Sequence, residues 1–240
     1  MQSSKDQTPL IAKPSVPLAT ILAVLVGFPA VSALVSTLLL DQSLFESTGL
    51  AFREVFWPIC TVWYCLQIFI LSKVLKTVGW GWRDIGFGLN RRKTLYFVSG
   101  YLIFACALFG FIEFALASKG SATPSSLSDF ANVGPVTRAE RVLFILMGLM
   151  AAICEELVYR GFAINAMRSR GLSKWLAVPV AAIPFVFQHG LKSLDQFWWF
   201  FGMGIVFGLM FVFIRNLYLN IVLHWLIILS AMLAILQAIG

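Results

Sequence analysis

The chain alternates between long runs of hydrophobic residues and short polar stretches. A helix needs about 20 mostly apolar residues to cross about 30 Å of hydrocarbon, and most of the runs approach that length. None shows the alternation of apolar and polar positions expected of a membrane β-barrel. The pattern therefore predicts an all-α, polytopic transmembrane helical bundle with about seven spans, at residues 17–40, 55–71, 95–117, 142–166, 175–190, 197–214 and 217–239.

Composition supports this class of protein. Hydrophobic residues make up 60% of the 240 positions, charged residues only 12%, and the mean hydropathy is +0.87. Soluble domains carry about 25% charged residues, so an ordinary soluble domain is excluded. The net charge is +7, but the basic residues lie beside the spans and form no single exposed patch. They indicate contact with membrane lipid and argue against nucleic acid as a partner.

The polar segments divide the chain into three parts. We expect a polar tail over residues 1–16, N-terminal transmembrane helices over 17–138 and a C-terminal core over 139–240. With the N-terminus inside, twelve Lys and Arg residues would lie inside and five outside. The positive-inside rule therefore favours an inside N-terminus. The compact chain and this charge bias suggest a bacterial inner (cytoplasmic) membrane.

Five ionisable residues lie deep within the predicted spans of the C-terminal core. A charged group at such depth costs a few kcal/mol or more, so it usually faces the bundle interior and has a partner. At about 1.5 Å per helical residue, Glu155, His189 and His224 lie about 18, 21 and 12 Å from the same end of the bundle. Three helices can thus bring them to one point. The full set is Glu155, Glu156, Arg160, His189 and His224.

Two of these residues can satisfy each other. Glu156 and Arg160 are four residues apart, so on an α-helix they are neighbours and can form an ion pair. Glu155 lies about 100° around the helix from Glu156 and is free to point elsewhere. A purely structural interpretation makes Glu156 and Arg160 a packing pair and Glu155 a spare polar contact.

Two chemistries could use the remaining residues. In one, Glu155 and a neutral histidine deprotonate a water that attacks a peptide carbonyl, while a second histidine or an asparagine stabilises the oxyanion. In the other, Glu155, His189 and His224 bind a divalent metal that activates the water. The zinc motif H-E-x-x-H is absent from the sequence, so we assign neither a metal nor a cofactor. No G-x-S-x-G motif marks a serine nucleophile.

At these residues the sequence resembles the CAAX prenyl endopeptidase and bacteriocin-processing family, also called type II CAAX proteases or glutamic intramembrane proteases. The family motif E-E-x-x-x-R is matched by "EELVYR" at Glu155 to Arg160, and F-x-x-x-H is matched by "FVFQH" at Phe185 to His189. The third motif, H-x-x-x-N, is half present, because His224 is followed four residues later by Ile228. Asn220, one turn before His224, is our candidate to replace the missing asparagine.

The resemblance implies a membrane endopeptidase that cleaves a peptide near the C-terminus of a membrane-associated substrate. Glu155 would act as general base on a water shared with His189, and His224 would help to stabilise the oxyanion. Glu156 and Arg160 would fix the helix and charge of Glu155, and Phe185 would shape the substrate pocket.

Two other functions compete with a peptidase. The absence of the family asparagine at Ile228 favours a non-catalytic immunity or peptide-binding sensor protein built on the same fold. A transporter could also use deep Glu and His residues as a proton relay. The absence of paired, Gly- or Pro-interrupted spans in matching halves argues against a transporter.

Overall fold

The structure is a computed structural model, and it describes residues 14–41, 43, 52–88, 95–96, 99–100, 103, 106–107, 110, 114 and 134–239. These residues form helices and turns and include no strand. The all-α prediction is therefore confirmed over the described part of the chain. Most of the predicted span 95–117 and most of the tail 1–16 lie outside the described residues. The total of about seven spans stays a prediction.

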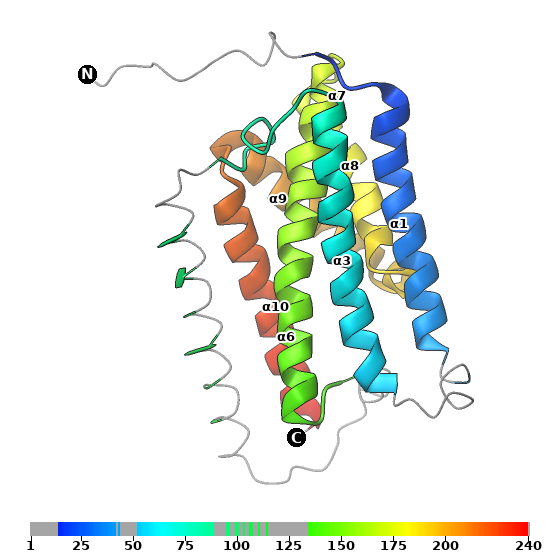
Figure 1. Cartoon of the computed structure of the whole chain (residues 1–240), viewed down its shortest axis with the longest axis vertical. Helices are drawn as coiled ribbons and strands as arrows, with labels where there is room; N and C mark the ends of the chain where they lie inside the picture. The colour runs from blue at the N-terminus through cyan, green and yellow to red at the C-terminus, as the bar shows by residue number, and fades with distance from the viewer. Residues whose placement is uncertain are drawn as a thin grey trace.

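Six helical rods form the described bundle (Figure 1). Four of its helices, Leu18–Leu40, Val55–Thr77, Arg138–Ser169 and Leu191–Ile214, are long and apolar enough to cross a membrane, so the chain is an integral membrane protein. The apolar helices Lys174–Gln188 and Leu217–Ser230 are shorter. The elements in order are α1 (Leu18–Leu40), α3 (Phe52–Thr77), α6 (Arg138–Glu155), η2 (Glu156–Ile164), α7 (Asn165–Ser169), α8 (Lys174–Gln188), η3 (Leu191–Gln196), α9 (Phe197–Ile214) and α10 (Leu217–Ile239).

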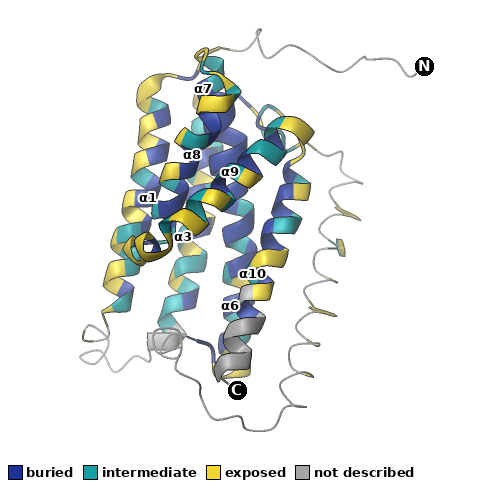
Figure 2. Ribbon diagram, turned by 180° about the vertical axis from the view of Figure 1, so that it is seen from behind, coloured by how far each residue is buried: buried dark blue, intermediate teal, exposed yellow. Residues whose placement is uncertain are grey.

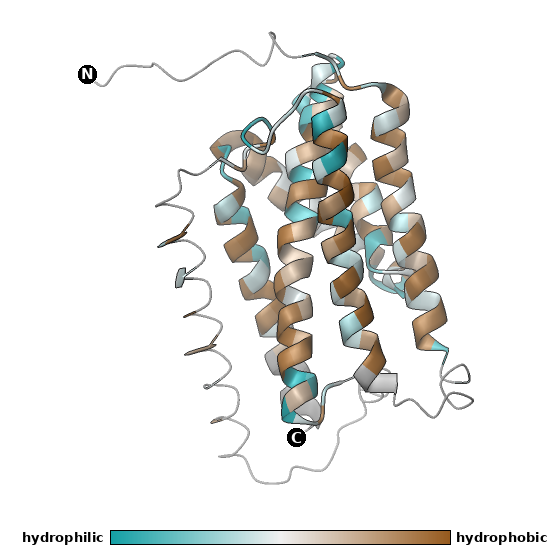
Figure 3. Cartoon of the chain, in the orientation of Figure 1, coloured by the Kyte–Doolittle hydropathy of each residue, from teal (hydrophilic) through white to brown (hydrophobic). Residues whose placement is uncertain are grey.

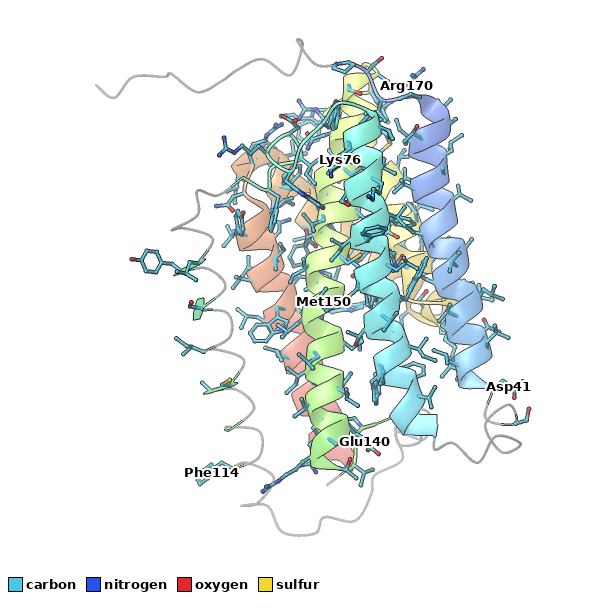
Figure 4. The ribbon with its side chains drawn as sticks, in the orientation of Figure 1. Asp41, Lys76, Phe114, Glu140, Met150 and Arg170 are labelled. Carbon is cyan, nitrogen blue, oxygen red and sulfur yellow. The ribbon has the colours of Figure 1, made fainter. Side chains whose placement is uncertain are left out.

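The continuous rod of α6, η2 and α7 runs through the whole height of the bundle (Figure 1). It packs against α3 and α10, while α8 packs against both α1 and α9. Lys76 and Arg170 lie at one end of the bundle, and Asp41 and Glu140 lie at the other (Figure 4). Hydrophobic residues cover the helices between these ends (Figure 3), and the buried residues face the inside of the bundle (Figure 2). The polar residues of the C-terminal core are therefore placed in an apolar surrounding.

A capping box sets the start of the long rod. The Thr137 side chain accepts a hydrogen bond from the Glu140 backbone N–H, and the Glu140 carboxylate accepts one from the Thr137 N–H. This exchange satisfies N–H groups that the first helical turn leaves unpaired. The helix consequently begins at Arg138, four residues before the apolar run that predicted it.

The rod changes from α-helix to π-helix between the two glutamates that begin the E-E-x-x-x-R motif. η2 keeps the wider π geometry for nine residues, whereas most π segments are single turns and many lie at functional sites. Within it, a Cβ on Gly161 would lie 2.9 Å from Leu217 Cδ1 and 3.1 Å from the carbonyl oxygen of Ile85. The Asn165 side chain donates a 2.7 Å hydrogen bond to the Gly161 carbonyl. The expectation of an ordinary α-helix through this motif was therefore wrong.

Helix α8 ends partway through the bundle, and the turn that follows it lies inside the bundle. α8 has 15 residues, about 22 Å of helix, against about 48 Å for the 32 residues of the long rod. Gly190 makes the turn with a φ of +85°, a conformation that favours glycine, and it approaches Ser36 of α1 closely. α9 then returns obliquely along the bundle (Figure 2) and packs Gly204 and Gly208 against α8. His189, at the end of α8, is thus held at mid-height.

Candidate active site

Glu155 ends α6 and is the least satisfied carboxylate of the site. Its side chain is 1% exposed. Oε1 accepts a 2.9 Å hydrogen bond from the Tyr64 hydroxyl of α3, whereas no described residue donates a hydrogen bond to Oε2. A buried carboxylate oxygen without a donor is costly, so its retention indicates a use.

Two imidazoles face that free oxygen. His189 Nε2 lies 3.7 Å and His224 Nε2 lies 3.6 Å from Glu155 Oε2. The structure therefore brings the three residues together from α6, α8 and α10. These separations exceed a direct hydrogen bond and fit a bridging water between the carboxylate and each ring.

The opposite nitrogen of each ring fixes its orientation. His189 Nδ1 lies 3.0 Å from the carbonyl oxygen of Phe185, which can only accept, so this nitrogen carries a hydrogen. A neutral His189 then presents the lone pair of Nε2 towards Glu155. His224 Nδ1 lies 3.0 Å from Glu156 Oε1, so each of its nitrogens faces a carboxylate oxygen.

Glu156, the next residue, is surrounded by donors. Its Oε1 lies 3.2 Å from Arg160 Nη1 and 3.0 Å from His224 Nδ1, and its Oε2 accepts a 3.0 Å hydrogen bond from Asn220 Nδ2. Asn220 also donates to the Phe207 carbonyl, at 2.8 Å. Asn220 is therefore bound to Glu156, and its role as a replacement for the family's oxyanion asparagine stays a prediction.

Phe185 packs behind the site. Its ring is 2% exposed, lies edge-on to the His189 ring at 4.9 Å and supports the Arg160 guanidinium at 4.1 Å. The Phe207 ring lies 5.5 Å from the same guanidinium. Such rings favour a buried cation. Phe185 therefore contacts both Arg160 and His189, and its role in shaping the substrate pocket stays a prediction.

A cavity of about 430 Å³ is bordered by Tyr64 and His189, the residues whose side chains lie next to Glu155. Aromatic and aliphatic side chains of α1, α3, α6 and α9 form most of its wall, and polar residues of the α8–α9 turn lie along one side. A mostly apolar cavity with a few convergent polar groups is typical of a ligand site. The residues that border it include Ser32, Val35, Phe56, Trp57, Cys60, Trp63, Tyr64, Phe144, Met147, Gln188, His189, Lys192, Ser193, Asp195, Gln196 and Phe200.

Tyr64 is the site residue that the sequence analysis missed. It lies in the apolar run 55–71, and only its hydroxyl distinguishes it there from a lipid-facing aromatic residue. Gln67, also in that run, is fully buried and accepts a hydrogen bond from the Cys154 thiol at 3.6 Å. Tyr64 and Gln67 are three positions apart and therefore lie on the same face of a helix. This polar pair in an apolar span was the available signal that one face of the helix points into the bundle.

A metal site was the alternative use of the three converging side chains. Among the residues that the structure describes, no group of three His, Cys, Asp or Glu side chains has an arrangement that could hold a metal ion. The separations of 3.6 and 3.7 Å instead leave each ring within reach of a shared water.

A comparison with known protein families bears on the C-terminal core. The model of the family described as type II CAAX prenyl endopeptidase Rce1-like matches residues 137–230, a range that holds Glu155, Glu156, His189 and His224. No curated protein and no solved structure matches the chain. The family and the apolar helices indicate a membrane protease of the CAAX type. Residues 137–230, from the cap of α6 into α10, are thus similar to the type II CAAX prenyl endopeptidase Rce1-like family.

Proposed function

We propose that the protein is an intramembrane endopeptidase of the glutamic type. The observation that carries this proposal is the Oε2 atom of Glu155, which is buried, accepts no hydrogen bond from the described residues and faces two imidazole nitrogens, one of them on His189 at the border of the cavity. A general base must lie within hydrogen-bond reach of the proton it removes, directly or through one water. A water at Oε2 would meet this requirement.

The reaction begins with this water held between Glu155 Oε2 and His189 Nε2. Glu155 takes one proton from the water, and the oxygen forms a bond to the carbonyl carbon of the scissile peptide. The carbonyl becomes an oxyanion, which accepts a hydrogen bond from His224 Nε2. The proton on Glu155 then passes to the leaving amine, the C–N bond breaks, and a carboxylic acid and an amine are released.

Charge balance supports a protonated His224 in this scheme. Glu155 and Glu156 carry two negative charges, and Arg160 carries one positive charge. In a buried site of low dielectric an uncompensated charge is costly. A proton on His224, which faces a carboxylate on each side, makes the cluster neutral and provides a donor at Nε2.

Glu156, Arg160 and Asn220 are positioning residues in this proposal. The ion pair and the amide hold Glu156, and Glu156 holds the Nδ1 side of His224. His224 consequently turns its Nε2 towards the free oxygen of Glu155. Residues that orient a histidine from its second nitrogen commonly fix its tautomer and direction.

The substrate that we propose is a peptide near the C-terminus of a membrane-associated protein. The family is named for prenyl endopeptidase activity on CAAX sequences, and the cavity wall is mainly apolar. Membrane lipid surrounds the bundle. We further propose an inside N-terminus in a bacterial inner membrane, which rests on the distribution of Lys and Arg.

A non-catalytic immunity or peptide-binding protein is the second candidate. Ile228 favours it, because the asparagine of the H-x-x-x-N motif is replaced by a side chain that cannot donate a hydrogen bond. In that case the same cavity would bind a peptide without cleaving it.

Cleavage by the purified protein separates the two candidates. The protein in lipid vesicles is incubated with internally quenched peptides, with and without a prenylated cysteine four residues from the C-terminus. We expect cleavage by the wild type and a loss of at least about 10³-fold in kcat for Glu155→Gln, because the general base is gone. Binding without cleavage, or undiminished cleavage by Glu155→Gln, would overturn the proposal. Inactivation by a chelator that zinc reverses would support the metal mechanism.

A further inference from the structure

We propose that the Tyr64 hydroxyl is the second donor to the oxyanion, in place of the asparagine that the family motif leads one to expect at Ile228. The inference rests on the proposed function. It assigns a catalytic residue to α3, outside the matched residues 137–230.

Neither Ile228 nor Asn220 has a free side-chain hydrogen-bond donor for the oxyanion. Ile228 is apolar and packs on α6, where a Cβ on Gly148 would lie 2.9 Å from its Cγ2. The Asn220 amide already donates to Glu156 Oε2 and to the Phe207 carbonyl. His224 alone would then stabilise the oxyanion, although such sites commonly use more than one donor.

Tyr64 lies where a donor is required. Its hydroxyl hydrogen-bonds Glu155 Oε1 at 2.9 Å, and the residue borders the cavity that a peptide would enter. It therefore faces both the proposed base and the space in which the carbonyl would lie. Among the described residues, Tyr64 alone donates a hydrogen bond to this carboxylate.

The reaction itself would transfer this hydrogen bond. Before attack, Glu155 is an anion and the best acceptor for the Tyr64 hydroxyl. When Glu155 takes the proton of the water it becomes neutral, and the negative charge moves to the carbonyl oxygen. The Tyr64 O–H then turns from the weaker acceptor to the stronger one without giving up its own proton. The interaction with substrate exists only once charge has moved, so it lowers the barrier without strengthening ground-state binding.

The test compares two substitutions, each of which removes the hydroxyl group of one buried tyrosine. Tyr64→Phe removes the proposed donor. Tyr159→Phe is the matched control, because Tyr159 is 1% exposed and its hydroxyl donates one 2.8 Å hydrogen bond to Gln188. Kinetics use the best-cleaved peptide of the quenched set and the full-length protein in vesicles. Binding is measured with that peptide carrying a phosphinate in place of the scissile amide, which mimics the tetrahedral oxyanion.

We expect Tyr64→Phe to lower kcat by about 10²–10³-fold with KM within about threefold, as for loss of one oxyanion donor. Phosphinate affinity should fall with kcat/KM, while Tyr159→Phe should stay within about threefold on every measure. A kcat of Tyr64→Phe within about threefold of wild type, or a loss of kcat with unchanged phosphinate affinity, would overturn the inference. The Glu155→Gln variant tests the proposed function separately. If Glu155→Gln is inactive and Tyr64→Phe is fully active, only the role of Tyr64 is wrong.

Discussion

Glu155 and Glu156 are neighbours in sequence, yet they face opposite kinds of surroundings. Glu156 points to the α9–α10 side, where Arg160, His224 and Asn220 occupy both of its oxygens. Glu155 points to the α3–α8 side, where one oxygen has Tyr64 and the other has no donor among the described residues. The closed side explains how charge is tolerated within the bundle, and the open side is where chemistry can occur.

The difference separates stability from activity. A carboxylate whose partners are complete contributes to a fixed structure, and removing it leaves those partners unpaired. A carboxylate with an unused oxygen contributes less to a fixed structure, because it has fewer partners to lose. Substitutions on the two sides should therefore change different measured quantities.

The largest effect should come from Glu156→Gln. It leaves the Arg160 guanidinium and two other donors without their anion in a buried site. Breaking a buried pair in this way costs about 3–5 kcal/mol, so the free energy of unfolding in detergent or bicelles should fall by that amount.

Glu155→Gln is the control for this comparison. The amide oxygen can still accept the Tyr64 hydrogen bond, so we expect a change in unfolding free energy within about 1 kcal/mol despite lost activity. Equal destabilisation by both variants would contradict the division into a closed and an open side.

A smaller effect is expected from Gly161→Ala in the π-helix. The added methyl would meet Leu217 and the backbone oxygen of Ile85, and the backbone oxygen cannot move like the tip of a side chain. Overpacking of this kind costs about 1–3 kcal/mol. Gly202→Ala in α9, where no atom lies within 4 Å of the added Cβ, should leave the thermal midpoint nearly unchanged. An unchanged thermal midpoint for Gly161→Ala would show that stability does not depend on the close approach of Leu217 and Ile85 to η2.

The smallest effect should be that of Asn220→Ala. It removes one hydrogen bond to Glu156 and one to the Phe207 carbonyl, for a loss of about 1–2 kcal/mol in unfolding free energy. Since Asn220 supports the closed side, kcat should fall far less than in Tyr64→Phe, by about fivefold at most. A larger loss of kcat than that of Tyr64→Phe would instead return Asn220 to the role first predicted for it.

The helical architecture was predictable because the apolar runs are long and their ends are marked. Two of the described helices, Phe197–Ile214 and Leu217–Ile239, have the bounds of the predicted runs. Helix α6 begins at Arg138, earlier than the apolar run predicted. The capping box extends the helix into polar sequence that hydropathy assigns to a loop. A threonine followed three residues later by a glutamate was a readable signal.

The site was predictable in part. The cost of placing charge in a bilayer drew attention to Glu155, His189 and His224, and helical rise placed them at comparable depth. The π geometry of η2 was not predictable, because hydrophobic periodicity does not register a local widening of nine residues. The position of Asn220 depends on the direction of its amide within packed helices, which sequence spacing does not reveal. Tyr64 was missed because its helix lies far away in the chain.

The turn at Gly190 has a consequence for how specificity can evolve. Gly190 lies close to Ser36 of α1, while α1 and α3 supply much of the cavity wall from outside the matched residues. The matched residues thus carry Glu155 and the two histidines, whereas α1 and α3 bound the space for the substrate and α3 also supplies the proposed donor Tyr64. Changes in α1, or in α3 away from Tyr64, can alter which peptides enter while the reacting groups keep their geometry. Diversification of substrate range should therefore concentrate in the N-terminal helices, and a chimaera that takes α1 from a similar protein but keeps Tyr64 should change selectivity.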